Sequence, residues 1–171
     1  AGAHPISRFL LCALSVLSNG WWLNDVLECA QTGFLGITQE ETDKLCAYCE
    51  GADVRGDALK RPLRYPRGVT EEELDALEES REKIAAPLLA LQKDMSRAQT
   101  ADDTIQAILK LLEGVKAYET LENMRDELNH IGMTSEAQDC AQVWNALMET
   151  LDQLHTLLGG RAVPAQIVQN L

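Results

Sequence analysis

The sequence predicts an all-α protein of about seven helices, and three observations lead to this prediction. Apolar residues recur at helical spacing through most of the 171 residues. Strand signals are nearly absent, since β-branched runs are few and no Asn-Gly hairpin occurs. Threonines followed three residues later by an acid mark helix starts, as in a capping box. We expect a helix-hairpin-helix-like N-terminal part and a C-terminal bundle of long helices.

The N-terminal part, residues 1–52, is predicted to hold three helices. They run from about Pro5 to Ser18, from Trp22 to about Ala30, and from Gln39 to about Glu50. Thr38 caps the third helix, with Glu41 three residues on. Trp21 and Trp22, together with Trp144 further along, are interpreted as core anchors.

A basic loop is predicted over residues 53–69. The preceding helix is expected to end before residue 51, where a run of helix breakers begins. The whole stretch 51–69 should therefore lack regular structure. The breakers are Gly51, Gly56, Pro62, Pro66 and Gly68. Within the loop, the sequence RGDALKRPLRYPR carries five cationic side chains against Asp57 alone. A loop of this length is typical of a functional or mobile segment.

An acidic helical bundle is predicted over residues 70–171, which carry most of the net charge of −12. Its first helix, opened by Thr70, follows a heptad to Met95, with Arg81 interrupting the apolar seam and Pro87 introducing a kink. Further helices are expected over about 100–115, 119–130 and 135–158, the last burying Val143, Trp144, Leu147, Leu151, Leu154 and Leu158. A final helix from Pro164 stops mid-pattern at Leu171, so we expect the chain to be a fragment of a longer protein.

Two segments are candidates for contacts with a DNA backbone. In the stretch TGFLGIT, glycines allow close approach to a ligand, and amides at a helix start suit a phosphate. The basic loop supplies cations, with Tyr65 able to stack on a base. The candidate residues are Thr32, Gly33, Gly36, Ile37, Thr38, Lys60, Arg61, Arg64 and Arg67. The alternatives are a compact turn with Phe34, Leu35 and Ile37 in the core, and a solvated loop beside an acidic neighbour.

Catalytic chemistry is not indicated. Cys46 and Cys49 have zinc-knuckle spacing, but a structural zinc needs two more ligands, and no second close Cys or His pair occurs. No HExxH, catalytic triad or Walker motif is present. We therefore expect no catalytic residue, no metal and no cofactor. The apolar runs are too short for a membrane span, and five cysteines, an odd number, fit reduced thiols in the cytoplasm. A thiol or zinc enzyme built on Cys46 and Cys49 stays as a third hypothesis.

The order of four segments resembles the AddB (RexB) family, the B-type subunits of bacterial AddAB helicase-nucleases. The segments are HPISRFLLCALSVLSNGWWLNDVLECAQTGFLGITQEETDKL, VRGDAL, IAAPLLAL and AQVWNALMETLDQL, and together they span nearly the whole chain. The family's lysine before Thr-Gly is replaced here by Gln31, and its Glu-Asn-Tyr ending by Cys46-Ala47-Tyr48.

The resemblance implies an internal helical insertion similar to the 2B subdomain of UvrD-like superfamily 1 helicases, whose glycine hairpin touches duplex backbone. It also implies a parent that processes double-strand breaks for recombination and responds to a Chi-type sequence. The nuclease domain, with its metal ligands and iron-sulfur cysteines, would lie elsewhere in the parent, and ATP use would rest with the A-type partner subunit.

The resulting hypothesis is a non-catalytic accessory domain that positions double-stranded DNA in recombinational repair. Its partners would be DNA, the rest of the parent subunit and the A-type helicase-nuclease subunit, with no membrane. The alternative is a protein-protein interaction scaffold without DNA contacts, which docks through the heptad over 74–95 and the acidic C-terminal half.

Overall fold

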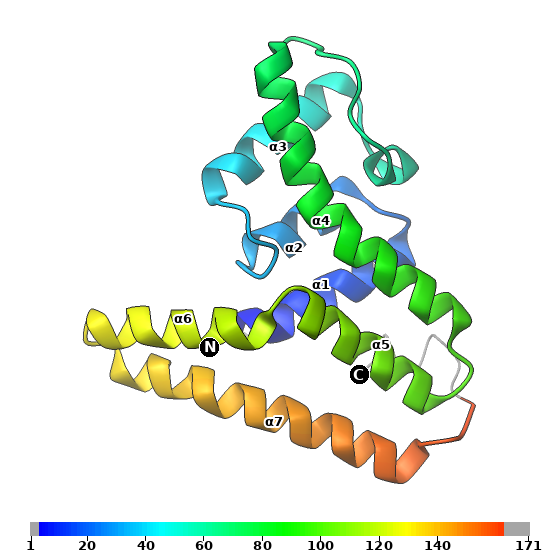
Figure 1. The fold of residues 1–171 in the computed structure, drawn as a ribbon, viewed down its shortest axis with the longest axis vertical. Helices are drawn as coiled ribbons and strands as arrows, with labels where there is room; N and C mark the ends of the chain where they lie inside the picture. The colour runs from blue at the N-terminus through cyan, green and yellow to red at the C-terminus, as the bar shows by residue number, and fades with distance from the viewer. Residues whose placement is uncertain (1–3, 163–171) are drawn as a thin grey trace. The chain divides into compact units, whose positions relative to one another are not determined.

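The structure is a computed structural model that describes residues 4–162. Within these residues it contains seven α-helices, one 3-10 helix and no strand, so the all-α prediction is confirmed. In chain order (Figure 1), the elements are α1 (Pro5–Asn19), α2 (Leu23–Gln31), α3 (Gln39–Ala52), η1 (Gly56–Lys60), α4 (Glu71–Arg97), α5 (Ala101–Gly114), α6 (Ala117–His130) and α7 (Thr134–Leu158). The helix predicted from Pro164 lies outside the described residues.

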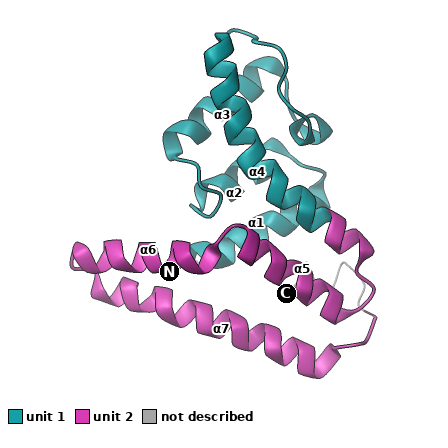
Figure 2. Cartoon of the chain, in the orientation of Figure 1, with its two compact units in different colours: residues 1–92 teal, residues 93–171 magenta. Residues whose placement is uncertain are grey.

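The chain divides into two compact units, residues 1–92 and residues 93–171, which Figure 2 colours separately. Unit 1 contains α1 to α3, η1 and most of α4, and unit 2 contains the end of α4 with α5 to α7. Pro87 lies inside α4, which continues to Arg97. None of the helices in the described part of the chain is both long and apolar enough to cross a bilayer.

Reciprocal capping fixes two helix starts of unit 1 where the sequence predicts them. The Thr38 amide donates to Glu41 Oε1 at 2.9 Å, and the Glu41 amide donates to Thr38 Oγ1 at 3.1 Å. Thr70 and Glu73 form the same pair of bonds, at 3.3 and 3.1 Å. Each pair satisfies two amides that a helix start leaves without intrahelical partners.

The core of unit 1 is built around one face of α1. Ile6, Phe9, Ala13 and Val16 recur at spacings of three and four residues and are fully buried. Phe34, from the hairpin between α2 and α3, stacks on Phe9 with the ring centroids 5.4 Å apart. The hairpin is therefore anchored in the core by its own side chain.

The two neighbouring tryptophans have opposite environments, which corrects the expectation that both anchor the core. Trp21 is 1% exposed, whereas Trp22 is 64% exposed. Gly20 and Trp21 both adopt left-handed φ values, +78° and +63°, so the chain reverses direction after α1. This turn directs the Trp21 ring inward, where its Nε1 donates to Gln92 Oε1 at 3.1 Å, and leaves the Trp22 ring outside.

The stretch 51–69 is more ordered than the sequence predicts. Helix α3 continues through Gly51 to Ala52, and residues 56–60 form η1. Two features favour this 3-10 turn. The Leu59 side chain is buried, at 2% exposed, and Lys60 Nζ lies 2.9 Å from Asp57 Oδ1 at i,i+3 spacing. The prediction of an unstructured segment was wrong at 51–52 and 56–60, because helix breakers do not prevent a 3-10 turn that buries an apolar side chain. It is confirmed at 53–55 and 61–69, which contain neither helix nor strand.

In unit 2, α6 and α7 form an antiparallel pair joined through residues 131–133 (Figure 1). Tyr118 of α6 meets Trp144 of α7 edge to face, with centroids 5.3 Å apart. Of the six α7 residues predicted to be buried, only Leu151 is; Val143, Trp144, Leu147, Leu154 and Leu158 are half-buried. The prediction overestimated burial because, among the described residues of unit 2, α7 packs mainly against α5 and α6, which cover part of its apolar stripe.

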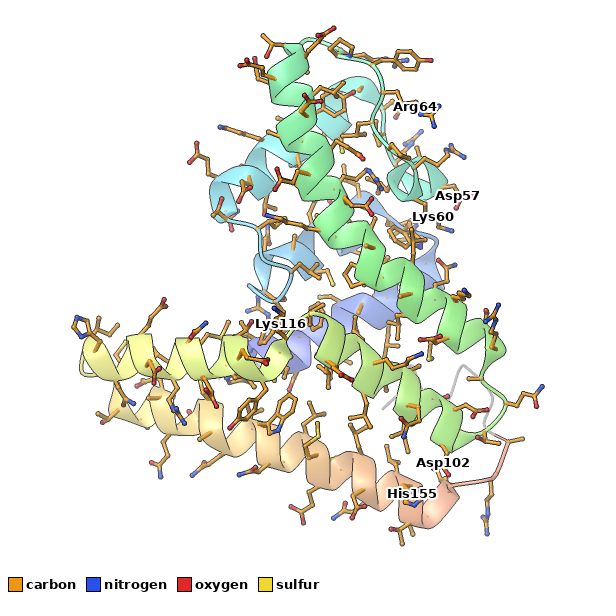
Figure 3. All side chains as sticks on the ribbon, viewed as in Figure 1. Asp57, Lys60, Arg64, Asp102, Lys116 and His155 are labelled. Atoms are coloured by element: carbon orange, nitrogen blue, oxygen red, sulfur yellow. The ribbon has the colours of Figure 1, made fainter. Side chains whose placement is uncertain are left out.

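An ion pair links the start of α5 to the last turn of α7. His155 Nδ1 lies 2.6 Å from Asp102 Oδ1, and the Asp102 amide donates to the Gly159 carbonyl at 3.0 Å. The hydrogen bond and the negative charge of Asp102 raise the pKa of His155 above its ordinary 6.5. Figure 3 shows the two side chains facing each other at this end of the unit.

We expect this pair to make the stability of unit 2 depend on pH. A raised folded-state pKa contributes stability that is complete below the unfolded pKa and is lost as the pH rises through the folded pKa. The melting temperature of the chain should exceed that of a His155→Gln variant at about pH 5.5, and the difference should shrink at about pH 9. A difference that stays constant between the two pH values would contradict a charged pair.

Candidate nucleic-acid interface

The hairpin between α2 and α3 has the backbone that its glycines predict. Gly33 and Gly36 adopt left-handed φ values of +89° and +72°, which side chains rarely tolerate. Between and after them, Phe34, Leu35 and Ile37 are buried. The compact-turn alternative therefore describes the side chains of this segment, and only its backbone and Thr38 face outward.

Both threonines of the hairpin use their polar groups in hydrogen bonds within the protein. The Thr32 hydroxyl is buried and donates to the Cys29 carbonyl at 2.7 Å. Thr38 uses both its amide and its hydroxyl in the capping box with Glu41. Hydrogen bonds first to the Thr38 amide and then to its hydroxyl hold the pKa of Glu41 below its usual value, so a carboxylate already accepts from one of the amides at this helix start.

The Gly36 amide is one of the hairpin donors that remain. In the described part of the chain, no hydrogen bond takes up this amide, and Gly36 is exposed. Glu40 and Glu41 follow it in the first turn of α3, with Lys44 pairing to Glu40 at 3.2 Å. The local charge is thus unfavourable to a phosphate at the hairpin.

Two of the five cations in the basic stretch are paired with neighbouring acids. Lys60 Nζ lies 2.9 Å from Asp57 and 5.6 Å from the centroid of the Trp21 ring, as a cation over an aromatic face. Arg55 lies 3.3 Å from Asp53. Figure 3 shows Lys60 and Asp57 together on η1. Lys60, a predicted phosphate contact, is therefore held against the protein.

The other three cations gather around one concave surface. Arg61, Arg64 and Arg67 are exposed, and none forms an ion pair with an acid among residues 4–162. All three line a pocket of about 570 Å³, with Tyr48, Tyr65 and Val54 among its other walls. We call this the arginine pocket. Its single acid, Asp53, is the one paired with Arg55.

Hydrogen bonds from two helices hold the loop that forms the arginine pocket. The Tyr48 hydroxyl of α3 donates to the Tyr65 carbonyl at 2.7 Å, and the Leu63 amide donates to Glu78 Oε1 of α4 at 3.0 Å. Tyr65 itself lines the pocket and is 68% exposed. The loop therefore has a fixed backbone and exposed cationic and aromatic side chains.

A buried arginine of α4 completes this support, and sequence reasoning missed its role. Arg81 is 2% exposed; its Nη1 donates to the Leu59 carbonyl at 3.1 Å and its Nη2 to Glu78 Oε2 at 2.9 Å. Burial acts to raise the pKa of Glu78, but hydrogen bonds from Arg81 and the Leu63 amide outweigh it and hold this pKa below its usual value. The sequence signal that could have indicated this role is an arginine at a core position of the heptad, Arg81, with a glutamate three residues before it, Glu78.

The hairpin and the arginine pocket lie near opposite ends of α3. The hairpin ends at Thr38, immediately before α3, and the loop follows its last residue, Ala52 (Figure 1). Fourteen helical residues correspond to about 21 Å of helix. The structure thus brings Arg61, Arg64 and Arg67 together but does not bring them to the hairpin.

The cysteine pair shows no feature of a reactive or metal-binding site. Cys49 is buried, and burial together with nearby Cys46 and Glu50 raises its pKa to about 12, which disfavours the thiolate. Among the residues that the structure describes, no group of three or more His, Cys, Asp or Glu side chains could hold a metal ion.

Comparison with known proteins places the chain beside one kind of protein, the B-type subunit of an ATP-dependent helicase/deoxyribonuclease. The chain is 27% identical over 98% of its length to this subunit from Bacillus subtilis, and 26% identical over 98% to that from Bacillus pumilus. It is 29% identical over 94% to the one from Geobacillus kaustophilus. In each case the chain spans 16% of the relative's length. No protein-family model matches the chain. The resemblance expected from the sequence is confirmed.

Proposed function

We propose that this chain corresponds to part of the B-type subunit of an ATP-dependent helicase/deoxyribonuclease. On this premise, it is a non-catalytic, 2B-like accessory domain that holds DNA through contacts with the DNA backbone. The parent would act in double-strand-break processing in the cytoplasm, with an A-type partner subunit. The observation that carries the proposal is the set of three arginines without acidic partners on the loop over 53–69.

The charges of the loop support phosphate contacts at one place. A guanidinium presents several donors in a planar fork that matches phosphate oxygens, and an arginine with no carboxylate partner can bind phosphate without first breaking an ion pair. Arg61, Arg64 and Arg67 satisfy this condition, whereas Lys60 does not. The loop contacts are therefore the main part of the proposal, and the exposed Gly36 amide adds one contact.

A second candidate function is a protein-interaction scaffold, and the α6–α7 pair favours it. Residues 117–158 contain eight acids and one arginine, so the charge of this pair of helices opposes DNA binding. Several apolar side chains of unit 2 are exposed: Tyr118, Ile131, Met133 and Leu157. A surface of this composition suits a basic partner protein.

Charge reversal of the three arginines tests the DNA proposal. We expect the chain to bind a labelled forked DNA duplex, with an affinity that falls steeply from about 20 to 200 mM salt. The logarithm of the binding constant should fall with the logarithm of the salt concentration at a slope of about −3, because each phosphate contact releases counterions. The variant with Arg61, Arg64 and Arg67 changed to Glu should bind at least about tenfold more weakly at low salt. Fluorescence anisotropy measures both.

The matched control reverses three exposed lysines of unit 2 instead: Lys93, Lys110 and Lys116, each changed to Glu. It alters the net charge by the same amount away from the loop, so only a small loss is expected. Equal losses in the two variants would mean that net charge, rather than the arginine pocket, decides binding. Absence of binding at every salt concentration would leave the scaffold as the function.

A further inference from the structure

We propose that the arginine pocket binds one unpaired nucleotide of a DNA strand, so that this site selects single-stranded segments or fork junctions over blunt duplex. The inference rests on the proposed DNA-binding function and specifies the form of DNA that the same loop recognises. It starts from the concave shape of the site, which phosphate contacts alone do not require.

The size of the pocket fits a single nucleotide. Its volume of about 570 Å³ lies within the range of roughly 300–1,000 Å³ typical of sites for small ligands. A duplex carries its phosphates on a convex outer surface with the bases stacked inside, so it can touch the rim but cannot fill the pocket. An unpaired nucleotide offers both its phosphate and the face of its base.

The chemistry of the walls matches those two parts. Arg61, Arg64 and Arg67 supply positive charge for the phosphate, and the one acid, Asp53, already pairs with Arg55. The exposed Tyr65 ring supplies a face for base stacking, a contact that tolerates any base. Apolar walls, including Val54, suit the sugar and the edge of the base.

The pocket is also held in shape before a ligand binds. Three hydrogen bonds fix the loop backbone on both sides: Tyr48 to the Tyr65 carbonyl, the Leu63 amide to Glu78, and Arg81 to the Leu59 carbonyl. A preformed loop loses little conformational entropy when a ligand binds. The side chains that would contact the nucleotide are left exposed by the same arrangement.

The test measures the binding of two labelled DNAs by fluorescence anisotropy: an oligothymidine of about 12 nucleotides and a blunt duplex. Each measurement is repeated with free ATP as a competitor. The key variant is Tyr65→Ala, which keeps the backbone carbonyl that Tyr48 binds. Tyr65→Phe keeps the ring, and Trp22→Ala removes another exposed aromatic of unit 1 that does not line this pocket.

We expect Tyr65→Ala to weaken oligothymidine binding about tenfold and duplex binding less than about twofold, while Tyr65→Phe and Trp22→Ala leave both within about twofold. Equal effects of Tyr65→Ala on both DNAs, or no effect on either, would overturn the nucleotide pocket yet leave backbone holding intact. ATP that displaces oligothymidine at micromolar concentration would reassign the pocket to a free nucleotide. A chain that binds neither DNA would refute the proposed function itself.

Discussion

Changing Arg81 to Met is expected to lower the free energy of unfolding of unit 1 by about 3 kcal/mol, at the lower end of what breaking a buried ion pair costs. The substitution keeps an unbranched apolar stem but removes every donor of the guanidinium. The Leu59 carbonyl would lose its Arg81 partner, and Glu78 would keep its charge without a cation beside it. A loss of this size is a large share of the stability of a typical domain.

The control for this prediction is Lys83→Met, two residues further along α4. Lys83 is exposed and pairs with Glu79 at 3.7 Å, so its removal should cost less than about 0.5 kcal/mol. Urea unfolding followed by tryptophan fluorescence reports on unit 1 in a Trp144→Phe background, because Trp21 and Trp22 both lie in that unit. If Arg81→Met and Lys83→Met cost the same, the buried pair contributes nothing to stability.

The role of Arg81 also links stability to the candidate interface. Because Arg81 and Glu78 hold the Leu59 carbonyl and the Leu63 amide, their loss should disorder the loop that carries Arg61 and Arg64. Under the proposed function, a variant at Arg81 would therefore weaken DNA binding although Arg81 itself does not touch DNA. A loss of DNA binding in a variant of Arg61, Arg64, Arg67 or Tyr65 is therefore assigned to the pocket itself when the free energy of unfolding of the variant matches that of the unsubstituted chain.

Local signals in the sequence predicted the helices well. Capping boxes act over three residues and need no knowledge of the rest of the fold, and they place the starts of α3 and α4 at the observed residues. The hairpin glycines were predictable for the same reason, since a left-handed φ is a local requirement. The resemblance to a helicase-nuclease family came from the order of whole segments.

Contacts between distant residues could not be predicted in this way. The arginine pocket depends on Tyr48, which lies 17 residues before Tyr65, and on a helix that begins after the loop. Charge counting placed Lys60 with the arginines, because a composition cannot show that Asp57 and Trp21 already hold it. Likewise, the pattern around Trp22 gives no sign that the left-handed turn at Trp21 directs the Trp22 ring outward.

Changing Phe34 to Ala is expected to cost about 3–5 kcal/mol in the free energy of unfolding of unit 1, the usual range for removing a buried aromatic ring. Phe34 is 2% exposed and stacks on Phe9, so truncation removes the ring contact and leaves a cavity beside α1. Phe34→Leu keeps most of the apolar volume and should cost about 1.5 kcal/mol or less. The fluorescence assay in the Trp144→Phe background measures both.

The exposed neighbour Trp22 supplies the comparison that separates a core plug from a surface ring. Trp22→Ala should change the unfolding free energy by no more than about 0.5 kcal/mol, because its ring is 64% exposed. If Phe34→Ala is as mild as Trp22→Ala, the hairpin does not depend on the core, and the compact-turn account of residues 32–38 fails. A large loss for Phe34→Ala with a small one for Phe34→Leu would mean that buried apolar volume holds the hairpin, which leaves backbone amides such as that of Gly36 as its available contacts.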